Sequence, residues 1–241
     1  MARVALVTGG TRGIGAAISK ALKASGYKVA ATYGGNDAAA DKFKAETGIP
    51  VYKFDVSDFA ACQEGVTRIT RDLGPVDILV NNAGITRDAV LHRMTKENWD
   101  AVIHTNLDSV FNMSRLVIEG MRARSFGRII NISSINGRKG QAGQANYAAA
   151  KAALLGFSKA VAQEAASRGI TVNVIAPGYI ATEMVQAVPK EILDTKILPF
   201  IPVGRLGTAE EVARCVSFLA DDAAGFITGA CLDANGGQYM A

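Results

Sequence analysis

The sequence predicts an α/β fold in which helices cover both faces of a parallel sheet. Short apolar runs alternate with helical segments along the chain, which is typical of strands joined by crossover helices. A glycine-rich turn follows the first apolar run and opens the first helical stretch. The length of 241 residues, of which 49% are hydrophobic, suits one domain with a large core. We therefore expect a single domain over residues 1–241 and no separate substrate domain.

Seven apolar runs are the candidate strands. They are residues 3–8, 28–33, 51–55, 78–80, 128–132, 171–176 and 230–233. Runs of this kind, separated by helical segments, are typical of strands that are buried on both faces. The order of elements predicts a doubly wound, parallel, seven-stranded sheet of the Rossmann type.

Turn and capping residues mark the ends of several elements. Gly169 follows a long helix as its C-terminal cap, and Pro177 closes the sixth strand. Thr208 and Glu211 have the spacing of a capping box that opens the last helix. Residues 179–205 contain three prolines and form the least regular segment. Loops of this length in a compact domain are often lids.

The turn after the first strand has the features of a nucleotide site. It reads Gly9-Gly10-Thr11-Arg12-Gly13-Ile14-Gly15. Glycines let the backbone approach a pyrophosphate, and free N–H groups at the start of the next helix receive its negative charge. The spacing differs from the general G-x-G-x-x-G fingerprint, so the motif matches by its position between strand and helix rather than by its letters.

A hydroxyl, a phenol and an ammonium group follow one another in the second half of the chain. Ser134 is followed by Tyr147 and then by Lys151, four residues after the tyrosine. Positions four apart share one helix face, so Lys151 can lie beside the phenol and lower its pKa. A shift from about 10 to about 7 requires roughly 4 kcal/mol, which a close cation in a partly dry site can supply. The pattern suits the proton donor of a carbonyl reductase, although a Tyr and a Lys at this spacing alone also suit an ordinary helix surface.

Several linked motifs resemble one enzyme family. They are Thr8-Gly9-x3-Gly13-x-Gly15, Asn81-Asn82-Ala83-Gly84, Asn106, Ser134 with Tyr147-x3-Lys151, and Pro177-Gly178. Their order and spacing resemble those of the short-chain dehydrogenase/reductase family over essentially the whole chain. More narrowly, residues 82–88 and 131–151 look like the NADPH-dependent acetoacetyl-CoA reductases. The 3-oxoacyl-ACP reductases share most of this pattern.

The resemblance implies a catalytic set of four residues. Tyr147 would be the general acid, and Ser134 would donate a hydrogen bond to the same carbonyl oxygen. Lys151 would also bind the nicotinamide ribose, and Asn106 would hold a water behind the lysine. From the residues alone Asn106 is an ordinary helix asparagine. Cofactor binding is expected mainly in residues 1–105, and catalysis and substrate binding mainly in residues 106–241, with a lid at about 179–205.

NADPH is the expected cofactor. An NAD-binding fold usually carries a carboxylate about twenty residues after the glycine turn, which would repel a 2′-phosphate. Here the second strand ends without an acid and Asp37 arrives late, whereas Arg12 can face that phosphate; the alternative is a solvated loop arginine. Asp55 resembles the residue that binds the adenine amino group, or caps a helix beside Ser57 and Asp58. The expected cofactor contacts are Gly9, Thr11, Arg12, Gly13, Ile14, Gly15, Tyr33, Asp55, Val56, Asn82, Ala83, Gly84, Tyr147, Lys151, Pro177, Gly178 and Ile180.

A small acyl-CoA is the substrate that the resemblance implies. The expected substrate contacts are Asp88, Ser134, Gln141, Gln144, Tyr147 and Tyr179. Four of them, Asp88, Gln141, Gln144 and Tyr179, also suit plain polar loop positions. The implied reaction is reduction of acetoacetyl-CoA to (R)-3-hydroxybutanoyl-CoA, as in polyhydroxybutyrate synthesis. Two alternatives remain: a 3-oxoacyl-ACP reductase of fatty acid synthesis, and a protein that binds NADP(H) without turnover.

Composition limits the other partners. The net charge is +4 without a long basic run, so charge does not point to nucleic acid. Cys62, Cys215 and Cys231 are odd in number and far apart, which favours thiols in a reducing compartment. His92 and His104 match no common zinc motif, so no metal is expected. No stretch reaches the ~18 apolar residues of a membrane span and no signal peptide is recognisable, so we expect a cytoplasmic protein that does not bind membranes.

Small residues predict an assembly. They gather on the helix that carries the tyrosine, at Ala148, Ala149, Ala150, Ala152, Ala153, Gly156 and Ala160. Such residues let another helix come close, and symmetric homo-oligomers commonly cover a face of this kind. The resemblance implies that these helices pair across a dimer axis, with a second contact at residues 233–241. We therefore expect a homotetramer.

Overall fold

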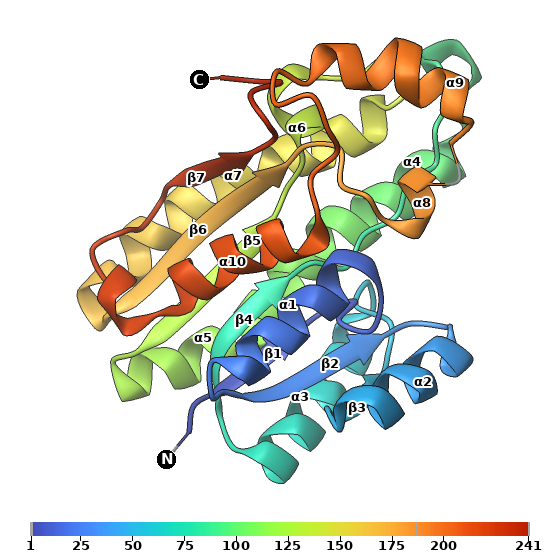
Figure 1. Cartoon of the computed structure of the whole chain (residues 1–241). Coiled ribbons are helices and arrows are strands. Elements are labelled where there is room, and N and C mark those ends of the chain that lie inside the picture. Colours follow the sequence, from blue (N-terminus) through green and yellow to red (C-terminus); the bar gives the residue numbers. More distant parts are fainter. Residues whose placement is uncertain (1, 187, 241) are drawn as a thin grey trace.

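The structure is a computed structural model that describes residues 2–186 and 188–240. In this part of the chain seven strands form one parallel sheet in the order β3-β2-β1-β4-β5-β6-β7 (Figure 1). They are β1 (Val4–Val7), β2 (Lys28–Tyr33), β3 (Val51–Lys53), β4 (Val76–Asn81), β5 (Gly127–Ile132), β6 (Ile170–Pro177) and β7 (Cys231–Ala234). The predicted α/β class and the doubly wound Rossmann sheet are confirmed.

The strands differ from the predicted runs only at their ends. The largest differences are in β3, which is shorter than predicted, and in β4, which begins earlier. β3 ends early because Asp55 turns away from the sheet and accepts hydrogen bonds from the backbone N–H and the hydroxyl of Ser57. The chain therefore leaves the sheet at the point where a cofactor contact was expected.

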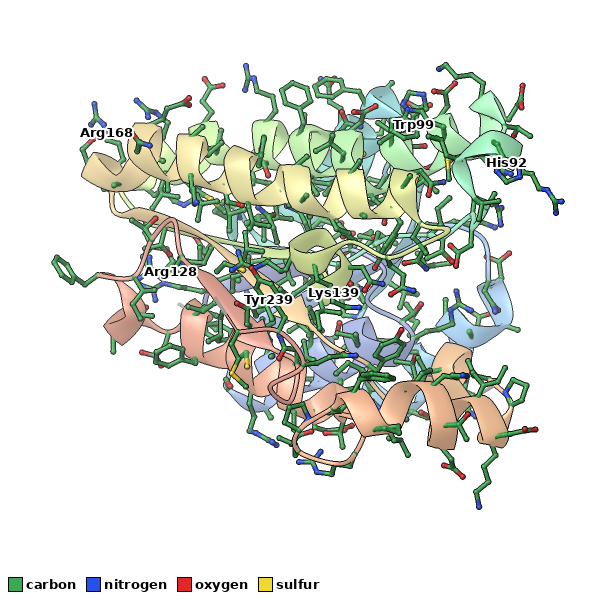
Figure 2. The ribbon with its side chains drawn as sticks, turned by 90° about the horizontal axis from the view of Figure 1, so that it is seen from above. His92, Trp99, Arg128, Lys139, Arg168 and Tyr239 are labelled. Carbon is green, nitrogen blue, oxygen red and sulfur yellow. The ribbon has the colours of Figure 1, made fainter. Side chains whose placement is uncertain are left out.

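Helices cover both faces of the sheet. One face packs against α1 (Gly13–Ala24), α2 (Asp37–Thr47) and α10 (Ala209–Ala220), and the other against α3 (Phe59–Leu73), α5 (Ser109–Arg124) and α7 (Ala145–Ala165). Figure 2 shows these layers from above, with Arg168 and Trp99 toward opposite ends of one helical layer. In the described part of the chain no helix is long and apolar enough to cross a membrane.

The predicted caps are present. Thr208 and Glu211 form both hydrogen bonds of the capping box at the start of α10. Gly169 has a left-handed φ of 68° and ends the 3-10 turn η3 (Ala166–Arg168), which follows α7. Pro177 is the last residue of β6. Pro177 and the capping box bound the loop at the carboxyl edge of the sheet, whereas Gly169 lies at the amino edge, directly before β6.

The segment that was expected to be irregular consists mostly of short helical turns. They are α8 (Glu183–Gln186), α9 (Lys190–Ile192), η4 (Leu193–Ile197) and η5 (Leu198–Phe200). Residue 187, which belongs to the predicted lid at 179–205, lies outside the described residues. Five further short elements are described: η1 (Leu91–Arg93), α4 (Lys96–Ile103), η2 (His104–Asp108), α6 (Ile135–Lys139) and η6 (Asp222–Ala224), which precedes β7.

A buried amide network holds the centre of the sheet. Asn81 of β4 donates to Asn131 of β5 at 2.8 Å, and Asn131 donates to Ser158 of α7 at 2.8 Å. All three side chains are buried. Buried hydrogen bonds between side chains of different elements restrict how those elements pack. The network therefore fixes α7 against the carboxyl ends of the two central strands.

Candidate active site

The glycine turn lies between β1 and α1 and leaves room for a ligand. Gly9 and Gly13 have left-handed φ angles of 60° and 49°. A Cβ on Gly15 would lie only 2.1 Å from the carbonyl oxygen of Gly9, so glycine is required for this close approach. Arg12 precedes α1, and its side chain does not cap the helix. The N-terminus of α1 is therefore open to an anion.

Thr8 and Asn82 brace this turn from behind. The hydroxyl of Thr8 accepts hydrogen bonds from the backbone N–H groups of Asn82 and Ala83, both at 3.0 Å. The Asn82 amide donates to the carbonyl oxygens of Thr8 at 2.9 Å and Gly9 at 3.2 Å. These bonds join the ends of β1 and β4. The predicted cofactor residues around position 82 thus shape the turn as well as line it.

Two cavities extend from the turn along the carboxyl edge of the sheet. One has a volume of about 380 Å³ and the other about 370 Å³. Predicted cofactor residues line them: Gly9, Thr11, Arg12, Gly13, Ile14, Gly15, Tyr33, Asn82, Ala83 and Gly84 line the first, and Asp55 and Val56 join several of these in the second. An open helix N-terminus, a glycine cradle and two adjoining cavities fit an elongated nucleotide cofactor.

The acid that follows β2 is engaged by protein groups. The carboxylate of Asp37 accepts hydrogen bonds from the Tyr33 hydroxyl at 3.1 Å and the Lys53 ammonium at 2.7 Å. The bond to Lys53 is the main cause that lowers the pKa of Asp37. The exposed Arg12 lines both cofactor cavities. The charge that faces these cavities from the turn is therefore positive.

A smaller cavity of about 170 Å³ brings three of the four predicted catalytic groups together. Its lining includes Ser134, Tyr147, Lys151, Pro177 and Gly178. It shares Ile14, Asn82 and Gly84 with the first cofactor cavity, so the two spaces adjoin. Because β4, β5 and β6 end here, the residues come from separate parts of the chain and meet only in the fold.

Ser134 has a structural role that the sequence analysis missed. It is the N-cap of α6, and its hydroxyl oxygen accepts a hydrogen bond from the backbone N–H of Asn136 at 3.1 Å. A serine in this position satisfies one free N–H of the helix. The same hydroxyl hydrogen-bonds to Tyr147, which lowers the pKa of the phenol. The cap thus holds the serine between the helix and the tyrosine.

The pKa of Tyr147 departs from the sequence prediction. Burial raises it, the bond to Ser134 opposes this, and the charge of Asp88 adds to the rise. The expectation that Lys151 lowers this pKa is wrong for this geometry, because the Lys151 ammonium donates to the Ile132 carbonyl oxygen at 2.8 Å and lies 5.7 Å from the centre of the phenol ring. The phenol therefore stays protonated at neutral pH, the form that can donate a proton.

Lys151 is itself buried. Its side chain is 4% exposed, and burial lowers the pKa of the ammonium group to about 8. A lysine with such a pKa exchanges its proton readily near neutral pH. The group behind the tyrosine is therefore suited to supply a proton as well as to carry a charge.

Asn106 lies in a single π-helical turn, η2, which the sequence analysis did not predict. Its amide nitrogen donates to the carbonyl oxygens of Ile85 at 2.9 Å and Val102 at 2.8 Å. Its Oδ1 atom is buried and has no partner among the described residues. A Cβ on Gly84 would lie 2.4 Å from this oxygen and 3.5 Å from the Lys151 Nζ. An acceptor is thus placed beside the lysine, and π-turns of this kind are frequent at functional sites.

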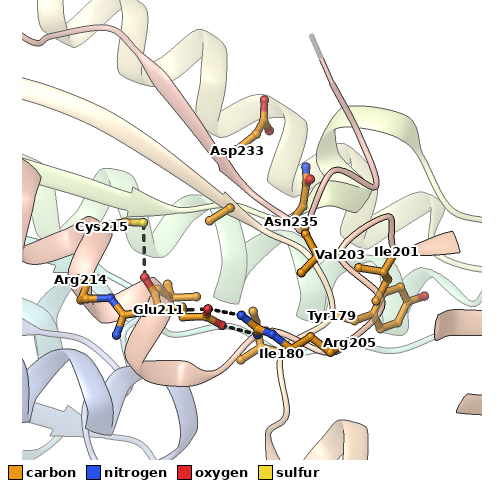
Figure 3. A pocket seen from close by; sticks show the side chains of 14 residues that line it. Tyr179, Ile180, Ile201, Val203, Arg205, Glu211, Arg214, Cys215, Asp233 and Asn235 are labelled. Carbon is orange, nitrogen blue, oxygen red and sulfur yellow. Dashed lines mark hydrogen bonds and ion pairs between the residues drawn. The ribbon is translucent and has the colours of Figure 1, made fainter. Parts of the chain in front are cut away.

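The predicted substrate residues do not all meet. Asp88 and Gln144 are joined by a hydrogen bond of 2.8 Å. Gln141 is exposed, and its side chain accepts a bond from Lys139 at 3.2 Å. Tyr179 lines a separate cavity of about 310 Å³ with Ile180, a predicted cofactor contact, beside the ion pair between Arg205 and Glu211 (Figure 3). Of the predicted substrate residues only Ser134 and Tyr147 line the catalytic cavity; it is not lined by Asp88, Gln141, Gln144 or Tyr179, nor by Ile180.

Other residues at the site were missed. Ile85, Thr86 and Ser133 line the catalytic cavity, and Thr182 and Glu183 line the first cofactor cavity. Asn136 contacts both the Ser134 hydroxyl and the Gln144 side chain. A signal for Asn136 was present, because the residue two after an N-cap serine is a usual partner of its hydroxyl. Thr182 carried no such signal.

The fold and the site define a class of protein, and comparisons with known proteins agree with it. The family described as Enoyl-(Acyl carrier protein) reductase matches residues 9–238. The chain belongs to the short-chain dehydrogenase/reductase family and is an oxidoreductase. This family and the Rossmann fold imply a nicotinamide cofactor.

Two similar proteins carry the same name. The chain is 67% identical over 240 residues to the acetoacetyl-CoA reductase of Shinella zoogloeoides, and 68% identical over 241 residues to that of Rhizobium meliloti (strain 1021), with 100% of each chain covered. It is 50% identical over 242 residues to the 3-oxoacyl-(acyl-carrier-protein) reductase FabG of Escherichia coli (strain K12), which covers 99% of this chain and 98% of that protein. The predicted resemblance to the acetoacetyl-CoA reductases is confirmed.

Proposed function

We propose that this protein uses NADPH to reduce acetoacetyl-CoA to (R)-3-hydroxybutanoyl-CoA, in the cytoplasm and as a step of polyhydroxybutyrate synthesis. The observation that carries the proposal is the cavity in which Ser134, Tyr147 and Lys151 meet beside the cofactor cavities. The names of the relatives that are 67% and 68% identical supply the substrate. A protein that only binds a nucleotide would have no need of this set of groups, which disfavours the alternative without turnover.

The residues of the small cavity have different roles in carbonyl reduction. Hydride transfer to the carbonyl carbon is the chemistry that NADPH supplies when bound. Tyr147 donates its phenolic proton to the carbonyl oxygen as negative charge develops there. Ser134 donates a hydrogen bond to the same oxygen, an interaction that strengthens as the charge grows. Both groups act from one side of the cavity, so they hold the carbonyl in a single orientation.

Lys151 and Asn106 return the proton that Tyr147 gives up. The ammonium of Lys151 has a pKa of about 8, well matched to proton transfer near neutral pH. The unpartnered Oδ1 of Asn106 lies beside Gly84, which also approaches the lysine. This oxygen can hold a water molecule that passes a proton from solvent to Lys151. Asn106 thus joins the catalytic set through proton supply.

The residues around the glycine turn favour NADPH over NADH. The open N-terminus of α1 and the backbone of Gly9, Gly13 and Gly15 would hold the pyrophosphate. Arg12 would pair with the 2′-phosphate, since the carboxylate of Asp37 is bound to Lys53 and Tyr33. Asp55 and Val56 would hold the adenine.

Arg12→Ala is expected to narrow the preference for NADPH. The parent should use NADPH with a specificity constant at least about ten-fold above that for NADH, which corresponds to roughly 1.4 kcal/mol. Removing the guanidinium takes away the partner of the 2′-phosphate and should leave NADH use nearly unchanged. Steady-state kinetics with both cofactors measures the two ratios. Equal use of the two cofactors by the parent contradicts the proposal.

The reaction itself is tested by following the loss of NADPH absorbance with acetoacetyl-CoA and by chiral analysis of the product. The proposal expects rapid oxidation of NADPH and the (R)-3-hydroxy thioester. Slow turnover with acetoacetyl-CoA but fast turnover with 3-oxoacyl thioesters of acyl carrier protein would favour the alternative of a fatty-acid-synthesis reductase, which the 50% identity to FabG supports.

A homotetramer is part of the proposal. Ala149, Ala152 and Gly156 of α7 are exposed along one side of the helix. The neighbouring α5 exposes Phe111, which is 53% exposed. An apolar, small-residue face of this kind suits close packing against a second copy.

A further inference from the structure

A chain of hydrogen bonds leads from the surface to the base of α6. The Asp88 carboxylate accepts a bond from the Gln144 Nε2 at 2.8 Å. The Gln144 Oε1 accepts a bond from the Asn136 Nδ2 at 2.8 Å. The backbone N–H of Asn136 donates to the Ser134 hydroxyl oxygen at 3.1 Å. The loop after β4 is thereby joined to the start of α7 and the first turn of α6, from which it is far apart in sequence.

The direction of this chain is fixed by its outer end. An ionised carboxylate can only accept hydrogen bonds, so Gln144 must turn its NH₂ group toward Asp88 and its oxygen toward Asn136. Asn136 must then present its own NH₂ group to Gln144. The charge of Asp88 therefore sets the orientation of two amides that lie between it and the serine.

Gln144 is committed to this chain. It occupies the N-cap position of α7, yet its side chain makes no capping bond to that helix. The adjoining backbone is tied to the same loop, since the N–H of Ala89 donates to the Gly143 carbonyl oxygen at 2.9 Å. The amide is thus held by partners on both sides, at Asp88 and at Asn136.

The inner end of the chain orients the serine. The Asn136 N–H occupies a lone pair of the Ser134 oxygen, which leaves the hydroxyl proton to donate away from α6. Ser134 and Tyr147 line the same cavity. The carbonyl of a substrate would meet the same proton. Movement of the first turn of α6 would therefore misdirect the serine without removing any catalytic group.

We propose that Asn136 is a positioning residue, which acts through the chain Asp88–Gln144–Asn136 to hold Ser134 in the orientation that carbonyl reduction requires. The inference rests on the proposed function, because reduction is its first readout. It also gives Asp88 and Gln144, which were expected to contact the substrate, a second role: through Asn136 their side chains orient the Ser134 hydroxyl.

The test exchanges the hydrogen-bond donor and acceptor at the two ends of Gln144. In Asn136→Asp a second carboxylate faces the Gln144 oxygen, and turning that amide over only moves the conflict to Asp88. The double variant Asp88→Asn, Asn136→Asp removes the conflict, since the asparagine at 88 donates to Gln144 and Gln144 donates to the carboxylate at 136. Net charge is the same in the double variant and the parent. Asn98→Asp on α4 is the matched control for the added charge of the single variant.

The expected result is a loss and a rescue. In Asn136→Asp kcat with acetoacetyl-CoA should fall at least about ten-fold, as expected when buried polar groups lose their partners, while NADPH affinity changes little. The double variant should recover most of that loss, and Asn98→Asp should resemble the parent. A crystal structure of each variant gives a readout independent of turnover: the Ser134 rotamer should be displaced in the single variant and restored in the double.

Either of two results would overturn the inference: parent-like kcat and an unchanged Ser134 rotamer in Asn136→Asp, or a double variant that folds and binds NADPH but is no better than the single variant. Failure of the proposed function looks different. In that case the parent itself does not reduce acetoacetyl-CoA, and the rotamers of Ser134 still decide whether the hydrogen-bond chain positions the serine.

Discussion

Tyr147→Phe is expected to abolish reduction and to leave NADPH binding nearly intact. The substitution removes the transferable proton and keeps the ring that lines the cavity. General acids contribute on the order of a hundred-fold to ten-thousand-fold to rate, so kcat should fall by at least about a hundred-fold. Single-turnover kinetics with saturating acetoacetyl-CoA measures the loss, and fluorescence titration measures NADPH affinity.

A matched control separates this effect from a general loss of a tyrosine. Tyr27 precedes β2 at the opposite edge of the sheet, and its hydroxyl donates to the Ala220 carbonyl oxygen at 3.4 Å. Tyr27→Phe should keep the parent's turnover. Substantial reduction by Tyr147→Phe would show that another group supplies the proton, and the assignment of the general acid would be wrong.

Lys151→Met is expected to be inactive and yet more stable than the parent. Activity is lost because the site loses its buried cation and its proton source. Stability rises because burial lowers the lysine pKa from 10.5 to about 8, which corresponds to roughly 3 kcal/mol against the folded state at neutral pH. The lost hydrogen bond to Ile132 offsets about 1 kcal/mol of this. The free energy of unfolding should therefore increase by about 2 kcal/mol.

The lowered pKa of Lys151 should also be visible in how the free energy of unfolding depends on pH. Between about pH 8 and pH 10.5 the unfolded chain binds a proton at Lys151 that the folded chain does not, so the contribution of Lys151 to stability becomes more favourable as pH rises through this window. Denaturant unfolding at about pH 7.5 and about pH 9.5 should show that the stability advantage of Lys151→Met over the parent shrinks at the higher pH, whereas Lys159→Met, which changes an exposed lysine on the same helix, should follow the parent at both. A less stable Lys151→Met at both pH values would show that the buried charge is stabilised in the fold.

Much of the fold was predictable because its signals are local. A strand buried on both faces is mostly apolar, as residues 171–176 are apart from the buried Thr171 and Asn173. Gly169 combines a left-handed backbone with a position where a Cβ would lie 2.5 Å from the Ser125 carbonyl oxygen, which requires glycine. The ends of β3 and β4 were less predictable. There a side-chain contact, Asp55 with Ser57, decides where the chain leaves the sheet, and such contacts are not visible as a pattern.

The parts of the candidate site that could be predicted are those where the backbone geometry itself demands particular residues or a particular spacing. Gly15 is required by the close approach of Gly9, and Tyr147 and Lys151 lie four apart on one helix. The direction of the Tyr147 pKa shift was not predictable, since it depends on burial and on where the lysine ammonium points.

Contacts between side chains of separate segments could not be predicted from the sequence either. Tyr179 follows Pro177-Gly178 at the carboxyl edge of the sheet, but its side chain lies in another cavity. Asn136 reads as a helix residue until the fold brings Gln144 against it. Both outcomes depend on side-chain directions at the meeting of separate segments, which neither spacing nor composition determines.

The most direct measurement of the central claim compares kcat/KM for acetoacetyl-CoA and for 3-oxoacyl thioesters of acyl carrier protein, with the same enzyme and NADPH. We expect a higher value for acetoacetyl-CoA, with the (R)-3-hydroxy thioester as product. A strong preference for carrier-protein thioesters would instead identify a fatty-acid-synthesis reductase, and NADPH binding without turnover of either substrate would contradict the assignment of a reductase to this site.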